Sequence, residues 1–120
     1  MRILFDSQKS QFKSPFGALT EGQSCRLHIH IPYSVGAIHA ECILDSEDGT
    51  SGLVFPLQKE STQGAYDIWS GSFALKPGLY FYYFKIDKPD GSFRLFKQGH
   101  DTNMEAGDLW QLTCTPADFT

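Results

Sequence analysis

The sequence predicts an all-β protein, an antiparallel β-sandwich of about seven to nine strands with essentially no helix. Two observations support this prediction. Apolar and polar residues alternate with a period of two in several short segments, and clusters of Gly, Pro, Asp and Ser separate these segments. In addition, no segment longer than about one helical turn has apolar residues at the 3.6-residue spacing of a helix.

The stretch Ala65–Asp87 is expected to lie at the centre of the sandwich. It predicts two antiparallel strands joined by a tight turn at Lys76-Pro77-Gly78, because proline presets φ and glycine accepts a positive φ. The first strand alternates apolar and polar residues, so one of its faces is buried. The second strand, Leu79–Asp87, is aromatic or β-branched on both faces, which is typical of a central strand.

Further strands are predicted on either side of this hairpin. They are Arg2–Phe5, Ser24–Pro32, Ile38–Asp45, Leu53–Gln58, Phe93–Phe96 and Asp108–Thr115. Proline removes a hydrogen-bond donor from the ladder, so Pro56 marks its strand as an edge. The buried face predicted for the strand that begins at Ile38 consists of Ile38, Ala40, Cys42 and Leu44.

The remaining segments predict connections. Residues 7–22 are polar and irregular, with Phe12, Phe16 and Leu19 as expected anchors in the core. Residues 46–52 and 88–91 are predicted turns, residues 59–64 a loop, and residues 98–107 at most one helical turn.

One feature specifies the type of sandwich. The run Gly78-Leu79-Tyr80 at the start of a strand predicts a tyrosine corner, in which the Tyr80 hydroxyl bonds to nearby backbone. Together with the short strands, this favours an immunoglobulin-like sandwich. Trp69 and Trp110 fall on the apolar faces of their strands and are predicted to lie in the core.

The composition predicts one globular domain, residues 1–120. A hydrophobic fraction of 41% against a charged fraction of 20% is ordinary for a folded domain that buries a core without disulfides or metal. The formal net charge is −4 and the sequence has no run of Lys or Arg, which argues against binding to nucleic acid or to an anionic membrane.

Cys25, Cys42 and Cys114 are an odd number of cysteines without a C-x-x-C pair. We interpret them as small buried hydrophobic residues, and the alternative is one disulfide with a free thiol. The first residues, MRILFDSQKS, contain too short an apolar run for a secretory signal, and no segment approaches a membrane span. A cytoplasmic location is therefore expected.

Several short motifs together carry a resemblance to a known family. They are Lys13-Ser14-Pro15-Phe16-Gly17-Ala18-Leu19, Tyr66-Asp67-Ile68-Trp69, Pro77-Gly78-Leu79-Tyr80, Tyr82-Tyr83-Phe84, Trp110-Gln111-Leu112-Thr113 and Thr115-Pro116. This series resembles the N-terminal immunoglobulin-like module of α-amylase-family glycosidases, glycoside hydrolase family 13, of the neopullulanase, cyclomaltodextrinase and intracellular α-amylase type. The resemblance implies that residues 1–115 form the module and that residues 116–120 begin a linker to a catalytic domain that the chain lacks.

The resemblance also implies a function. The family hydrolyses α-glucosidic bonds with two carboxylates carried by a (β/α)₈ barrel. Because the barrel is not part of this chain, the resemblance implies no catalytic residue and no cofactor here. The module of the relatives either binds α-glucan or packs beside the active site, in some cases across a homodimer. The implied partners are an α-glucan or maltooligosaccharide, the barrel and a second copy. Two alternatives are a docking or dimerisation module without sugar affinity and an unrelated sandwich scaffold.

A glucan-binding surface needs exposed aromatic rings for the apolar faces of sugars and polar neighbours for the hydroxyl groups. The candidate carbohydrate-binding residues are Tyr33, Tyr66, Asp67, Tyr83 and Lys85, with Gln58 as a further polar group. The alternative is that these aromatic rings cover the sandwich or contact the barrel.

Histidines suggest a second kind of site. His28 and His30 share the polar face of one predicted strand, and His39 and Glu41 lie on the next. Antiparallel pairing of these two strands would cluster imidazoles and a carboxylate, as in a zinc site. Surface histidines are common, however, and we predict no metal site. No G-x-S-x-G elbow points to a catalytic nucleophile.

Overall fold

The computed structural model describes residues 2–15, 17–47, 53–98, 101–103, 105 and 107–116. These residues form ten strands and one 3₁₀ turn, η1 (Tyr33–Val35). The strands are β1 (Lys13–Ser14), β2 (Leu19–Thr20), β3 (Cys25–Pro32), β4 (His39–Ser46), β5 (Leu53–Gln63), β6 (Tyr66–Phe73), β7 (Gly78–Lys88), β8 (Gly91–Gln98), β9 (Asp101–Asn103) and β10 (Trp110–Thr115). Across the described part of the chain, no helix is long and apolar enough to cross a bilayer.

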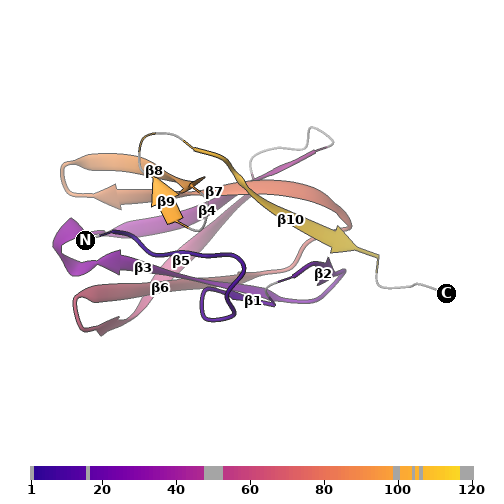
Figure 1. The fold of residues 1–120 in the computed structure, drawn as a ribbon, viewed down its shortest axis with the longest axis horizontal. Coiled ribbons are helices and arrows are strands. Elements are labelled where there is room, and N and C mark those ends of the chain that lie inside the picture. The colour runs from indigo at the N-terminus through magenta and orange to yellow at the C-terminus, as the bar shows by residue number, and fades with distance from the viewer. Residues whose placement is uncertain are drawn as a thin grey trace.

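The strands lie in two layers that are joined through β5 (Figure 1). Sheet A contains β1, β3, β6 and the second half of β5, and sheet B contains the first half of β5 with β4, β7, β10 and β2. β8 pairs with the second half of β7, and β9 pairs with β8. The pairing of β10 with β2 is parallel and the other ladders are antiparallel. The prediction of an all-β sandwich is confirmed.

The inner faces of the two sheets enclose one hydrophobic core. Alternate residues of β3 and β7 point into it, and Leu27, Ile29, Phe84 and Ile86 are fully buried. Trp69 and Trp110 are 5% and 2% exposed, so their predicted place in the core is confirmed. The cysteines are buried and free, which confirms their interpretation as small hydrophobic residues.

The predicted hairpin Ala65–Asp87 is wrong in its pairing. β6 pairs with β3 and β5 in sheet A, whereas β7 pairs with β4, β8 and β10 in sheet B. The turn at Lys76-Pro77-Gly78 therefore carries the chain from one sheet to the other. Tyr80 stabilises this passage, because its ring is buried and its hydroxyl donates a hydrogen bond to the Lys76 carbonyl at 2.8 Å. The predicted tyrosine corner and the central position of β7 are both confirmed.

The strand predicted to end at Gln58 continues through the expected loop to Gln63, so the prediction for residues 59–64 is wrong. β5 exchanges partners along its length: residues up to Leu57 pair with β4, and residues from Gln58 pair with β6. The change occurs where Leu57 lies against Gly71 of β6. A Cβ atom at Gly71 would lie 2.7 Å from Leu57 Cδ2 and 3.0 Å from the Pro56 carbonyl oxygen. Glycine is therefore required for this close approach.

Other elements differ from the prediction in extent. The expected strand Arg2–Phe5 is reduced to one isolated bridge between Leu4 and His30. The side chain of Ile38 is 65% exposed, because β4 begins one residue later and Ile38 belongs to the connection from β3. β8 is longer than expected. β9 lies within residues 98–107, for which at most one helical turn was predicted.

Lys13 explains the motif that begins with it. Its side chain is 2% exposed, and its ammonium donates hydrogen bonds to the carbonyls of Pro15 at 2.7 Å and Gly17 at 2.8 Å. Burial lowers the pKa of Lys13. Phe12 and Leu19, on either side of this loop, are buried as predicted, and Phe16 lies outside the described residues. The motif therefore has a structural role, in which Lys13 holds the backbone of the first connection.

We expect Gly71→Ala to lower the free energy of unfolding by about 1–3 kcal/mol, because the added methyl group overpacks the contact with Leu57. Urea denaturation followed by tryptophan fluorescence measures the change. Gly17→Ala is the matched control, because no atom lies within 4 Å of the position of its Cβ. Equal stability of the two variants would show that the close approach is not required.

Tyr80→Phe should cost about 1 kcal/mol of folding free energy, because it removes the bond to the Lys76 carbonyl but keeps the ring. Thermal and urea unfolding test this expectation. Tyr33→Phe is the control, since that ring is exposed. If both variants are as stable as the parent chain, the tyrosine corner does not stabilise the passage between the sheets.

Candidate functional site

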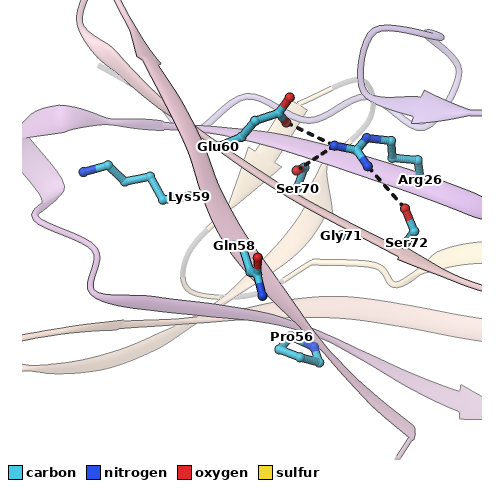
Figure 2. Close-up of a pocket in the computed structure, with 8 residues that line it drawn as sticks. All are labelled: Arg26, Pro56, Gln58, Lys59, Glu60, Ser70, Gly71 and Ser72. Carbon is cyan, nitrogen blue, oxygen red and sulfur yellow. Dashed lines mark hydrogen bonds and ion pairs between the residues drawn. The ribbon is translucent and has the colours of Figure 1, made fainter.

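A polar groove lies on sheet A at the point where β5 crosses from one sheet to the other (Figure 2). Its volume is about 420 Å³. The side chains that line it come from β3, β5 and β6, and they include Arg26, Pro56, Gln58, Glu60, Ser70 and Ser72.

Strand register explains why polar side chains meet there. Arg26 of β3 pairs with Ser72 of β6, and Ser70 pairs with Gln58 of β5. These residues alternate with core residues such as Leu27, which is fully buried, so they must point to the outer face of sheet A. The outer face of the sheet therefore carries the groove.

Glu60, which lines the groove, lies at a β-bulge. The pairing of β5 with β6 shifts between Lys59 and Ser61, which leaves Glu60 without a partner opposite it. A bulge of this kind redirects a side chain and bends the strand. The Glu60 carboxylate lies 3.4 Å from Arg26 Nη2 and 3.4 Å from His28 Nε2, both on β3, which β6 separates from β5.

Arg26 is the centre of the hydrogen-bond network in the groove. Its guanidinium donates to Ser70 Oγ at 3.2 Å, to Ser72 Oγ at 3.4 Å and to Glu60 Oε2 at 3.4 Å, as the dashed lines in Figure 2 show. These bonds are longer than the usual N–H···O distance of about 2.9 Å. The side chains of Arg26 and Glu60 are 47% and 45% exposed, so both are accessible to a ligand.

Charges in and beside the groove are balanced. A hydrogen bond from Ser70, followed by the charges of His28 and Arg26, lowers the pKa of Glu60, which is therefore a carboxylate at neutral pH. Lys59 points away from Arg26 in Figure 2, and its ammonium lies 3.8 Å from Asp67. Each cation thus has a carboxylate beside it.

Tyr33 and Tyr66 lie at one end of the sandwich. The Tyr33 side chain, on η1, is 66% exposed, and its backbone N–H donates to the Ala65 carbonyl at 2.7 Å. Tyr66 begins β6, is half-buried, and its ring centroid lies 6.4 Å from that of His30. The connections β3–β4, β5–β6 and β7–β8 meet at this end, on the left in Figure 1.

Asp67 points inward rather than to solvent. Its register partner is Ile31, a core residue, and Asp67 itself is 4% exposed. Its carboxylate accepts a hydrogen bond from Thr62 Oγ1 at 2.6 Å and lies near Lys59. The side chain is thus engaged in joining β5 to β6.

Tyr83 and Lys85 lie on the opposite side of the molecule, on the outer face of sheet B. The Tyr83 ring stacks on Phe96 with centroids 5.7 Å apart, and the Arg94 guanidinium lies 5.7 Å from its centre. The ammonium of Lys85 lies 4.0 Å from Oδ1 of Asp87 on the same strand. The structure therefore separates the candidate carbohydrate-binding residues into two groups on different sheets.

The histidine cluster that the sequence left open does not form. His28 and His30 lie on β3 in sheet A, whereas His39 lies on β4 in sheet B, and β3 pairs with β6 rather than with β4. Within the described ranges, no group of three His, Cys, Asp or Glu side chains is arranged to hold a metal ion.

Sequence reasoning missed the groove. Arg26 and Glu60 are 34 residues apart, and the loop predicted for residues 59–64 placed Glu60 outside any sheet. The polar residues Gln58 and Glu60, two positions apart, were a signal that the strand continues, but the bulge breaks the period of two beyond Glu60. The orientation of Glu60 toward Arg26 could not be inferred from the sequence.

Asp67→Ala is expected to lower the free energy of unfolding by about 1–2 kcal/mol, because Thr62 and Lys59 lose their partner. Urea denaturation measures the loss, and Glu21→Ala, at an exposed position, is the control. An Asp67 variant of unchanged stability would contradict a structural role for this carboxylate.

Comparison with known proteins gives a likeness of fold. No family model and no curated protein matches the chain. Among solved structures, a cyclomaltodextrinase matches with a TM-score of 0.67 at 14% sequence identity. The match covers 93% of this chain and 19% of the cyclomaltodextrinase chain. At this identity the likeness shows the fold, and this chain corresponds in length to a small part of that protein.

Proposed function

We propose that the chain is a non-catalytic accessory domain of an α-amylase-family glycosidase, and that it contacts α-glucans such as starch, maltooligosaccharides and cyclodextrins. The observation that carries this proposal is the structural match: nearly the whole module corresponds to 19% of a cyclomaltodextrinase chain. That proportion is what one accessory domain of a larger enzyme would give. The motifs from Lys13 to Pro116 that resemble the family support the same proposal.

The proposed sugar contact is the end of the sandwich that carries Tyr33 and Tyr66. An aromatic ring stacks on the apolar face of a sugar, and Tyr33 is the most exposed large aromatic side chain among the described residues. Tyr66 lies beside it in the fold, at the start of β6. Tyr83 and Lys85 form a second, separate candidate contact on sheet B.

A titration of the chain with a linear maltooligosaccharide and with a cyclodextrin, followed by amide chemical shifts, tests the proposal. A cellooligosaccharide is the control for linkage. We expect shifts around Tyr33 and Tyr66 with the α-glucans alone. Equal shifts with the cellooligosaccharide would contradict a preference for α-glucans, and the absence of shifts with any sugar would contradict sugar binding.

We expect Tyr33→Ala to weaken binding of the maltooligosaccharide about fivefold, because the stacking platform is removed. Isothermal titration or the same chemical-shift titration gives the dissociation constant. Tyr33→Phe keeps the ring and should bind as the parent chain does. Loss of affinity in both variants would point to a role of the hydroxyl rather than to stacking.

A docking module without sugar affinity is the second candidate function. The observation in its favour is an apolar row across the outer face of sheet B, in which Val54, Ile43 and Tyr83 are register neighbours and Phe96 stacks on Tyr83. Val54 is 48% exposed. Sedimentation over a range of concentrations tests self-association through this row, and Val54→Arg should abolish any dimer that forms there.

A further inference from the structure

We propose that the groove around Arg26 and Glu60 is a binding site for the hydroxyl groups of a neutral sugar chain, and that it continues the contact made by Tyr66 along the outer face of sheet A. This inference rests on the proposed function for the identity of the sugar. It adds a site that the candidate aromatic residues did not include.

The balance of charge in the groove selects the class of ligand. Arg26 lies beside Glu60, and Lys59 lies beside Asp67, so an anion would have to compete with a carboxylate for either cation. A metal ion would find one carboxylate, Glu60, among the residues that line the groove. A ligand that is uncharged and rich in hydroxyl groups has no such competitor.

The chemistry of the lining residues suits hydroxyl groups. Arg26 presents a planar fork of donors, Glu60 accepts, and the hydroxyls of Ser70 and Ser72 do both. The amide of Gln58 adds another donor and acceptor on the same face. Neighbouring hydroxyl groups of a sugar ring each donate and accept, so they can be satisfied by this set at once.

The existing network can exchange its bonds for those of a ligand. The hydrogen bonds of Arg26 to Ser70, Ser72 and Glu60 are 3.2–3.4 Å long, and both charged side chains are nearly half exposed. Long hydrogen bonds of half-exposed charged side chains contribute little to stability. Replacing them by bonds to a sugar therefore costs little.

The groove and Tyr66 lie on one continuous face. Outward positions of β3 and β6 run from the pair Arg26 and Ser72 to the pair Pro32 and Tyr66. The six-residue interval on β6 corresponds to about 20 Å at the rise of a strand. A linear oligosaccharide that stacks at Tyr66 would therefore reach the groove, whereas a single sugar unit would occupy one end.

A double variant, Arg26→Met with Glu60→Gln, tests the groove in the full chain. We expect its affinity for maltoheptaose to fall about tenfold, which is about 1.4 kcal/mol, with an unchanged melting temperature. The matched control is Lys76→Met with Glu21→Gln, which makes the same change of charge at two exposed positions that do not line the groove. Gln58→Ala is a second groove variant in case the double variant does not fold.

The pattern of chemical shifts separates this inference from the proposed function. Shifts at Gln58, Ser70 and Ser72 that weaken in the groove variants and persist at high salt support a neutral sugar in the groove. Shifts confined to Tyr33 and Tyr66, with full affinity in every groove variant, overturn the groove but keep the proposed function. Chemical-shift changes in the groove with inorganic phosphate and none with maltoheptaose overturn the inference. The absence of chemical-shift changes with every sugar overturns both proposals.

Discussion

The passage of β5 between the two sheets is the constraint on which the rest of the structure depends. One strand of eleven residues pairs with β4 in its first half and with β6 in its second half. Hydrogen-bonded strand pairing therefore continues from one layer into the other through β5. The passage requires that β5 approach β6 within van der Waals contact at Gly71. Packing at this point therefore fixes how the two sheets lie over the core.

The same passage creates the groove. A strand that bends away from its sheet leaves the outer face concave, and Glu60, the extra residue of the bulge after Lys59, lies beside Arg26. Leu57 is buried on the inner side and Gln58 is exposed on the outer side because successive residues of a strand point to opposite faces.

The sequence predicted the elements better than their partners. Alternation identified β3, β4, β6 and β10, and the run of aromatic and β-branched residues on both faces identified β7. The Tyr80 corner and the core positions of the tryptophans followed from local pattern. The pairing of β6 with β7 was predicted wrongly, because a Pro-Gly turn has the same residues whether it closes a hairpin or connects two sheets. The cluster of His28, His30 and His39 that the sequence left open does not form, because β3 and β4 are neighbours in sequence but not in a sheet.

The candidate residues divide according to what they do for stability. Asp67 was chosen as a polar partner for sugar, yet its carboxylate is buried and holds Thr62 of the adjacent strand. Arg26 and Glu60 are nearly half exposed and joined by a long hydrogen bond, so this pair is expected to contribute little to stability. A neutral, solvent-facing set of donors and acceptors beside a bulge is suited to exchange its bonds for those of a ligand. For the proposed sugar, the position of Tyr66 on the same face implies a path along β6 from the end of the sandwich toward Ser72.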